Sequence, residues 1–335
     1  MLTFLRKHRL RTHLAPLCGW AVVCLLASLA TGCDSILSSK GGGEEEPITL
    51  PVETFNTIDS YPAWSRDGKT IAYTHFPQTP EEVQFGADMQ VWLLDLATGR
   101  KRFLTVGWLP AWSPDGGKVA FVRGVLFDAD IYVIELATGE VAQLTDWGMC
   151  FEPDWSPDGK RIAFNSGSGY RLENTGIWTM NPDGSEKERV VKEGGNDPAW
   201  SPDGTKIAYV NLFQSDVLSE EILVVDVDGG TPRPLTTDER TDRSPAWSPD
   251  GKWIAWTSSG GGPNNPTTGV WTMHPDGSGK HLLALNGGLP SWSPDGKQIV
   301  YYGSYDERTG TLWTMNADGS DQRPLTRPED YKPKQ

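Results

Sequence analysis

The chain of 335 residues is poor in the side chains from which disulfide bonds and metal centres are built. It has four cysteines and five histidines. Cys18, Cys24 and Cys33 belong to the N-terminal region, which leaves Cys150 alone in the remainder. A single cysteine cannot form an internal disulfide, so an apolar core must hold the fold. The histidines lack metal-ligand spacing and no Gly-x-Ser-x-Gly motif is present, so we predict no metal, cofactor or catalytic residue.

Long apolar runs are also missing, apart from one near the N-terminus. There a basic stretch precedes an apolar run from Leu14 to Ala30, followed by Gly32-Cys33. This order is typical of a secretory signal peptide, predicted here over residues 1–32. The segment Leu29-Ala30-Thr31-Gly32-Cys33 resembles the lipobox of bacterial lipoproteins, which implies acylation of Cys33. The alternative is an ordinary signal peptide that happens to precede a cysteine.

Positive charge is scarce in the rest of the chain. The formal net charge of −14 becomes −18 without residues 1–32, which hold four basic and no acidic residues. A surface of this sign repels phosphate backbones, so no nucleic-acid partner is predicted. Residues 33–51 contain three consecutive glycines and three consecutive glutamates. Such a segment cannot bury enough apolar area to fold, and we predict a flexible tether there and a short tail over residues 329–335.

The chain is rich in copies of one unit. A Trp-Ser pair, followed by a turn that reads Pro-Asp-Gly in five copies and Arg-Asp-Gly in the first, recurs every 43 to 48 residues. Serine can cap such a turn, proline presets φ, aspartate bonds the backbone and glycine takes the left-handed position. Four short apolar pieces per unit, bounded by Gly, Pro, Asp and Asn, predict strands. The marker tryptophans are Trp64, Trp112, Trp155, Trp200, Trp247 and Trp292.

Units of four antiparallel strands repeated radially form a β-propeller, because the stacked sheets bury one another's faces. We therefore predict an all-β, six-bladed propeller of four-stranded antiparallel blades over residues 52–328. The closure of the ring is left open, since residues 54–57 and residues 323–326 both match the fourth strand of a unit. One of these segments is expected to pair across the seam between the chain ends.

The motif from Pro245 to Lys252, with Ile-Ala-Tyr after it in other copies and a closing Leu-Thr, resembles the propeller repeats of the TolB family. The resemblance covers residues 55–326 and implies a cell-envelope protein that binds a protein partner without chemistry of its own. TolB also has an α/β domain before its propeller, where a predicted tether stands here. The resemblance therefore does not extend to docking on the inner-membrane Tol machinery.

In a propeller, the Ser-Pro-Asp-Gly turns and the second hairpin turns share one face, and the variable connections share the other. Binding residues usually lie on such variable loops. We expect exposed aromatic side chains around a channel mouth, and an acidic mouth formed by Glu152, Asp154 and Asp197 for a cation or a basic ligand. The alternatives are aromatics packed under their own loops and carboxylates that are merely solvated. The predicted partner-binding residues are Trp108, Trp147, Phe151, Glu152, Asp154, Tyr170, Asp197, Phe213 and Arg243.

These observations predict a monomeric, non-catalytic lipoprotein that binds an envelope protein or peptide through its variable loop face. Its N-terminal lipid would hold it on the periplasmic or outer surface side of a bacterial membrane, with inner and outer membrane both open. Two other functions stay open: a metal-assisted lyase or hydrolase, and a propeller that binds a glycan or another small ligand.

Overall fold

The computed structural model describes residues 58–76, 89–167, 175–192, 194–211, 220–260, 268–306 and 309–327. Within these residues every regular element is a strand except η1 (Leu126–Asp128), a single turn of 3₁₀ helix. The predicted all-β fold is therefore confirmed. In this part of the chain no helix is long and apolar enough to cross a bilayer. The predicted signal peptide, the tether with Cys33 and the C-terminal tail lie outside the described residues.

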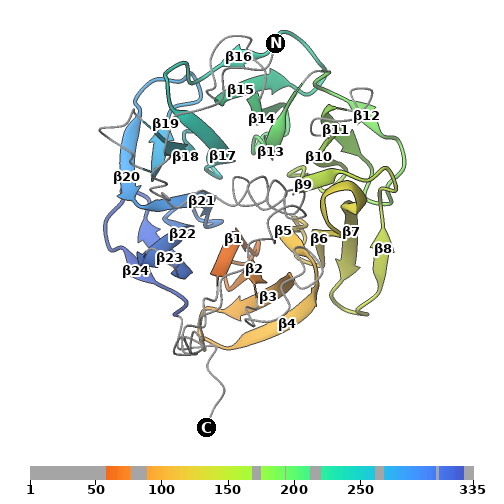
Figure 1. The fold of residues 1–335 in the computed structure, drawn as a ribbon, viewed down its shortest axis with the longest axis horizontal. Helices are drawn as coiled ribbons and strands as arrows, with labels where there is room; N and C mark the ends of the chain where they lie inside the picture. Colours follow the sequence, from red (N-terminus) through yellow and green to blue (C-terminus); the bar gives the residue numbers. More distant parts are fainter. Residues whose placement is uncertain are drawn as a thin grey trace, which may run out of the picture. The chain divides into compact units, whose positions relative to one another are not determined.

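Four of the sheets each contain four strands in antiparallel order, with the strands following one another as in the sequence (Figure 1). The second strands are buried on both faces, as in β10, where every residue is buried, and turn residues between the strands account for this order. The strands are β5 (Trp108–Trp112), β6 (Lys118–Arg123), β7 (Asp130–Glu135) and β8 (Val141–Gln143); β9 (Cys150–Trp155), β10 (Ile162–Ser166), β11 (Gly176–Met180) and β12 (Glu188–Arg189); β13 (Asn196–Trp200), β14 (Lys206–Asn211), β15 (Glu221–Asp226) and β16 (Arg233–Pro234); and β17 (Thr241–Trp247), β18 (Ile254–Ser259), β19 (Gly269–Met273) and β20 (His281–Leu285).

The remaining sheet has eight strands and contains both ends of the repeat array. Its two sets of four are antiparallel inside, and a single parallel pair, Ile58 with Gly310, joins them. The segment Arg323–Pro324 pairs with its own neighbour β23, and not across the seam. Residues 54–57, the other candidate strap, lie outside the described residues. The strands are β1 (Ile58–Trp64), β2 (Thr70–Phe76), β3 (Gln90–Asp95), β4 (Lys101–Val106), β21 (Gly287–Trp292), β22 (Gln298–Asp306), β23 (Thr309–Asn316) and β24 (Arg323–Pro324).

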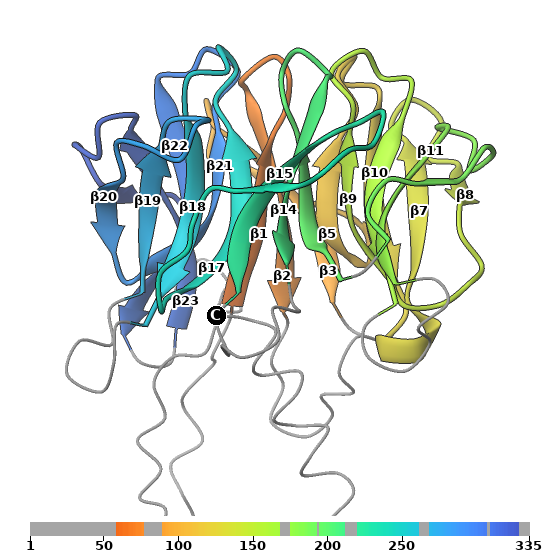
Figure 2. The ribbon, with the colours of Figure 1, turned by 90° about the horizontal axis from the view of Figure 1, so that it is seen from above.

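The first strand of each set lies nearest a common axis, and the fourth lies outermost (Figure 1). Figure 2 shows that the turns after the Trp-Ser pairs and the second hairpin turns lie at the same end of the strands, as predicted. Apolar clusters form between neighbouring sheets. One of them joins Ile177 of β11 to Trp200 of β13 and Tyr209 of β14, all less than a tenth exposed.

The marker serine explains why the first turn repeats so faithfully. In the unit of Trp200, Ser201 is 3% exposed, and its hydroxyl donates to Asp203 Oδ1 at 2.6 Å. The Ser201 hydroxyl oxygen also accepts the backbone N–H of Lys206 at 2.9 Å. Gly204 follows with a φ of 71°, the left-handed conformation that glycine adopts without strain. The hydrogen bond from Ser201 and the backbone N–H of Thr205 lower the pKa of Asp203.

We expect Ser201→Ala to lower the free energy of unfolding by about 1–3 kcal/mol, because the partly buried N–H of Lys206 loses the acceptor that the buried Ser201 hydroxyl provides. Urea-induced unfolding followed by fluorescence measures this change. Ser185→Ala is the matched control, since Ser185 also bonds an aspartate of its turn but is exposed. A loss at Ser185 as large as that at Ser201 would contradict the burial argument.

The turns of neighbouring units also contact each other. The glycine of one turn lies against the proline of the preceding turn, so that a Cβ at Gly159 would sit 3.2 Å from Pro114 Cγ. The same contact crosses the seam, where a Cβ at Gly68 would be 3.6 Å from Pro294 Cγ. The turn of the last unit therefore contacts that of the first as the turns of four other successive pairs do, whereas Gly116 has no such neighbour because Arg66 replaces the proline of the preceding turn.

Candidate functional site

A cavity of about 410 Å³ lies among the first strands of all six units. In each unit its lining begins three residues before the marker tryptophan, and in all units but that of Trp200 it extends beyond this tryptophan toward the turn. Because the lining residues are equivalent in the repeats, the cavity surrounds the axis seen in Figure 1. We call it the axial cavity.

A strained backbone position recurs at the rim of the axial cavity. Three residues before each marker tryptophan, a non-glycine residue has a φ between 50° and 56°, and a proline follows it. The pairing register of each first strand shifts at this point, which marks a β-bulge with one extra residue. Such positions cost about 1–3 kcal/mol each and persist only where their surroundings hold them. They are Tyr61, Leu109, Glu152, Asp197, Ser244 and Leu289.

Hydrogen bonds between neighbouring units hold several of these positions. The backbone N–H of Leu109 donates to Thr74 Oγ1 of the preceding unit at 3.0 Å. The N–H of Leu289 donates in the same way to Thr257 Oγ1 at 2.8 Å. The bulge takes the N–H of Leu109 and of Leu289 out of the strand pairing, and the threonine hydroxyls of the preceding unit accept these N–H groups. The proline that follows has no N–H and needs no acceptor.

Carboxylates make the corresponding contacts on one side of the cavity. Glu152 Oε2 accepts the N–H of Asp197 at 2.5 Å, and Asp197 Oδ2 accepts the N–H of Ser244 at 2.8 Å. Asp154 Oδ2 accepts the N–H of Trp200 at 2.7 Å. All three predicted acidic residues therefore line one cavity, as the acidic-mouth hypothesis requires. Each of these carboxylates bonds the backbone of the next unit, and Asp154 and Asp197 are also partly exposed.

The electrostatic environment of the cavity is uneven. Burial raises the pKa of Asp154 to about 7, although the N–H groups of Trp200 and Trp155 oppose this rise. Glu152, Asp154 and Asp197 come from two neighbouring sheets, whereas Arg66 is the sole basic residue of the lining. One wall can thus attract a positively charged group, and protonation of Asp154 near neutral pH would weaken that attraction.

Trp108 and Phe151, which were expected to be exposed, are buried. Trp108 is 7% and Phe151 is 3% exposed, and their rings contact edge to face at 5.6 Å. Tyr61 meets Trp108 from the other side at 6.4 Å. The error arose because both residues were assigned to loops around a channel mouth, whereas the structure places Trp108 in β5 and Phe151 in β9. These rings form an apolar layer between three first strands and are not free to contact a partner.

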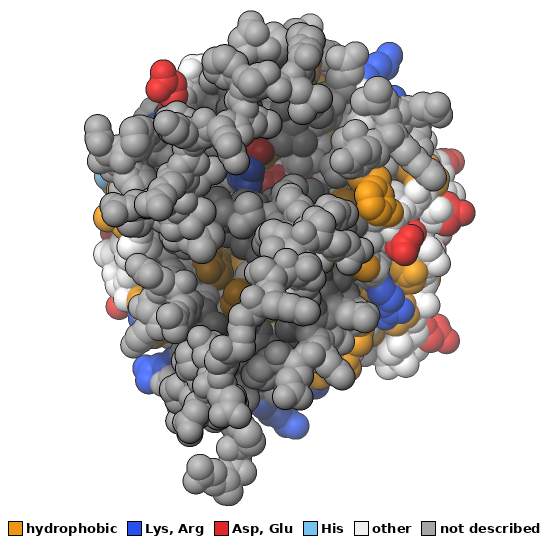
Figure 3. Space-filling view, in the orientation of Figure 1, with side chains coloured by type: hydrophobic (Ala, Val, Ile, Leu, Met, Phe, Trp, Pro, Cys, Tyr) orange, Lys and Arg blue, Asp and Glu red, His pale blue; other side chains and the backbone are white. Residues whose placement is uncertain are grey.

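The remaining predicted residues do not join the cavity lining. Trp147 is partly buried and meets Trp178 edge to face at 4.9 Å, with Lys187 Nζ 5.7 Å from its ring centre. Arg243 donates to Glu220 Oε1 at 2.6 Å. Figure 3 shows a basic side chain beside acidic ones near the axis on the face it presents. The last two predicted residues, Tyr170 and Phe213, lie outside the described residues.

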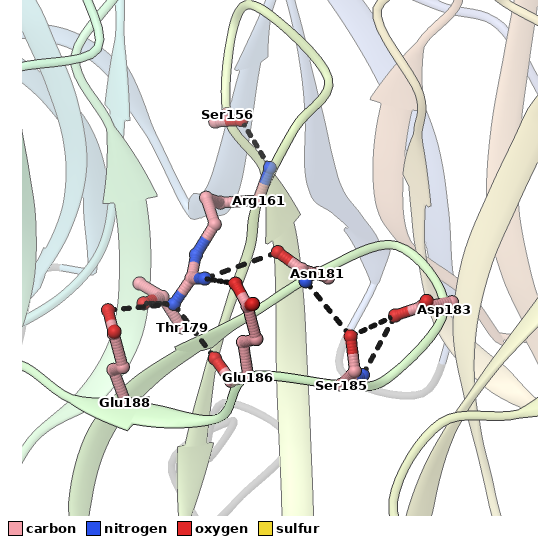
Figure 4. A network of polar contacts seen from close by, with 8 residues as sticks. All are labelled: Ser156, Arg161, Thr179, Asn181, Asp183, Ser185, Glu186 and Glu188. Atoms are coloured by element: carbon pink, nitrogen blue, oxygen red, sulfur yellow. Dashed lines mark hydrogen bonds and ion pairs between the residues drawn. The ribbon is translucent and has the colours of Figure 1, made fainter.

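Two polar groupings were not anticipated from the sequence. His75 Nδ1 lies 2.7 Å from Asp59 Oδ1 in a buried pair on adjacent strands, beside Trp92. Arg161 donates to Thr179, Asn181, Glu188 and the carbonyl oxygen of Glu186, which ties the first turn of its unit to the second (Figure 4). Over the described ranges, no group of three or more His, Cys, Asp or Glu residues could hold a metal ion.

Comparison with known proteins supports the repeat assignment. The model of the TolB beta propeller domain matches residues 52–216 and 173–333. Among solved structures, TolB from Acinetobacter baumannii is 24% identical with a TM-score of 0.63, over 75% of this chain and 62% of that one. Putative TolB from Agrobacterium tumefaciens is 23% identical with a TM-score of 0.60, over 77% and 90%. Oligogalacturonate lyase from Vibrio parahaemolyticus is 14% identical with a TM-score of 0.54, over 80% and 92%.

At these identities the likeness shows the fold alone. The chain spans 62% of the length of the Acinetobacter protein. Among curated proteins, none matched.

Proposed function

Because the chain belongs to the TolB β-propeller domain family, we propose that it is a six-bladed, non-catalytic binding propeller that receives a segment of a partner protein in its axial cavity. The six marker units and the contact of Gly68 with Pro294 support a closed ring of six blades. In this ring the eight-stranded sheet is two blades joined at Ile58 and Gly310.

The size and charge of the axial cavity define the segment that fits. A volume of about 410 Å³ is within the range of about 300–1,000 Å³ for sites that bind small ligands, and it accepts a few side chains but no folded domain. Prolines and tryptophans are 16 of the 33 residues that line it, and Glu152, Asp154 and Asp197 provide the negative charge. The segment is therefore an extended peptide with at least one lysine or arginine. The carboxylates lining the cavity are the observation that carries this proposal.

The proposed setting is the bacterial cell envelope. The predicted signal peptide over residues 1–32 and the lipobox-like segment ending at Cys33 support export and lipidation. Metabolic labelling with a radioactive or clickable fatty acid tests this step. Label in the full chain and none in Cys33→Ser is the expected result, and equal label in both variants would contradict it.

Partner binding can be tested by closing the axial cavity. Ala246 is a partly exposed lining residue, one blade beyond Asp197. We expect Ala246→Arg to fill the cavity with a guanidinium group and to abolish co-purification of the partner from detergent-solubilised envelopes. Ala246→Ser is the matched control and should retain the partner. An unchanged set of co-purified proteins with Ala246→Arg, at unchanged thermal stability, would reject the axial site.

A further inference from the structure

A second cavity, of about 700 Å³, lies between the sheet β17–β20 and the strands β21–β24. It is found at the end of the strands that carries the turns (Figure 2), because its lining includes the turns after Trp247 and after Trp292. We call it the turn cleft. Its lining includes Trp253, Thr272, His281 and three aspartates, Asp250, Asp295 and Asp318.

The position of Trp253 in the repeat indicates that the turn cleft lacks a basic side chain that other units have. Trp253 lies six residues after its marker tryptophan, and the same position is Lys118, Arg161 and Lys206 in three other units. Each of those cations is paired with an acidic residue of its own unit. At this position the unit of Trp247 has an aromatic ring in place of the cation.

The surroundings of Arg161 show how this framework holds a guanidinium group. Arg161 donates to Thr179 Oγ1 at 2.8 Å and to Glu188 Oε2 at 3.1 Å (Figure 4). Thr179 pairs with Glu188 in the strand register, and Thr272 pairs with His281 in the same way. Thr272 therefore has the same place in its unit as Thr179, whose hydroxyl accepts a hydrogen bond from Arg161, and Thr272 lines the turn cleft.

Trp253 is suited to contact a cation from a partner. One part of its indole stacks on His274, with ring centroids 4.2 Å apart, and Trp253 also lines the turn cleft. Elsewhere in this protein guanidinium groups lie over aromatic rings, as Arg240 does over Trp271 at 5.0 Å. Tryptophan is the strongest aromatic partner for such a cation, and the planar guanidinium stacks on it better than an ammonium group does.

The charges around the turn cleft have the sign that this ligand requires. Hydrogen bonds from neighbouring serines lower the pKa values of Asp250, Asp295 and Asp318. Lys252 and Lys297 pair with the first two at 3.2 and 3.5 Å. Asp318 has no ion pair within the described part of the chain, and no Lys or Arg is part of the lining.

We propose that the turn cleft binds an arginine side chain of a partner polypeptide. The guanidinium group lies against the indole of Trp253, and its N–H groups donate to the carboxylate of Asp318 and the hydroxyl of Thr272. The turn cleft adjoins the axial cavity and shares Pro249, Trp292 and Pro294 with it. Trp253, Thr272 and Asp318 line the turn cleft alone, so the proposal does not depend on the proposed function of the axial cavity.

The test is a titration of the full chain in detergent with N-acetyl-arginine-amide, followed by saturation-transfer NMR. N-acetyl-citrulline-amide is the matched neutral probe. We expect binding of the arginine probe and none of the citrulline probe. Trp253→Lys should weaken binding at least roughly tenfold, because it removes the stacking surface and adds a competing cation. Trp253→Phe should retain most of the affinity, and Asp318→Asn should lose several-fold.

The outcomes separate this site from the axial one. Asp154→Asn should leave binding of the arginine probe unchanged, because Asp154 lines the axial cavity and no residue of its sheet lines the turn cleft. Binding that is lost in Asp154→Asn but kept in Trp253→Lys would overturn the proposal and assign the probe to the axial cavity. Equal binding of the two probes, or no binding by a correctly folded chain, would also overturn it.

Discussion

Replacing Trp292 with alanine is expected to lower the free energy of unfolding by about 4 kcal/mol. The side chain is 9% exposed and belongs to the apolar cluster between β17–β20 and β21–β24, together with Leu283 and Tyr301. Its indole N–H also donates to the carbonyl oxygen of Ala246 in the preceding unit at 3.1 Å. The substitution therefore removes both the packing and the hydrogen bond between two units. Urea-induced equilibrium unfolding gives the value.

Trp292→Phe is the control, because it keeps most of the ring volume and removes only the indole N–H. We expect this variant to lose about 1–2 kcal/mol, the usual contribution of one buried hydrogen bond with some misfit. If Trp292→Ala cost less than Trp292→Phe, contact between the units at this position would not stabilise the ring.

Asp154→Asn is expected to make the protein more stable at pH 8 and to leave its stability unchanged near pH 4. Burial raises the pKa of Asp154 in the folded state to about 7, whereas an unfolded chain has a value of about 3.9. Between these pH values the unfolded state has released the proton and the folded state retains it, so wild-type stability falls as the pH rises. The loss is complete above pH 7 and is at most on the order of 4 kcal/mol.

The asparagine variant avoids this cost, because its amide oxygen still accepts the N–H of Trp200. Unfolding midpoints of both proteins between pH 4 and pH 8 test the expectation. Asp158→Asn, in the turn of the same unit, should behave in the opposite way. Hydrogen bonds from Ser156 and Lys160 lower the pKa of Asp158, so its carboxylate stabilises the fold at neutral pH and this contribution is lost in acid. Parallel curves for wild type and Asp154→Asn would show that Asp154 is not buried in the folded state.

The fold could be predicted because its signals are local. Ser201, Asp203 and Gly204 act within one turn, and each has the role in the structure that its chemistry suggests. The period of the marker tryptophans then requires that the turns stack in order. The pairing between the two ends of the repeats could not be predicted, because β1 and β23 pair through a single residue pair and no sequence motif marks it.

The candidate site could be predicted only in part. Asp154 was assigned to a channel because it stands at a first-strand position, and Glu152 and Asp197 because they stand at nearby positions between blades. The structure places all three around one cavity. Their bonds to the backbone of the next unit depend on the distance between two sheets, which a single strand does not encode. The burial of Trp108 and Phe151 was missed because both were assigned to exposed loops, whereas they lie on β5 and β9 and pack against each other.

The sequence contains a signal for the turn cleft that was not recognised from the repeats alone. Comparison of equivalent positions would have singled out Trp253, where three other units have lysine or arginine. The consequence of that exchange, an open cavity beside Trp292, depends on packing between two units. No pattern within one unit predicts it.

Site-specific photo-crosslinking in intact cells tests the proposed axial binding site most directly. A photoreactive phenylalanine derivative placed at Ala63 lies in the wall of the axial cavity, and the same group at Val141 lies on an exposed outer strand. We expect illumination to give an adduct with the partner protein from position 63 and none from position 141. An adduct from position 141 alone would show that the partner binds the outside of the propeller and not its axis.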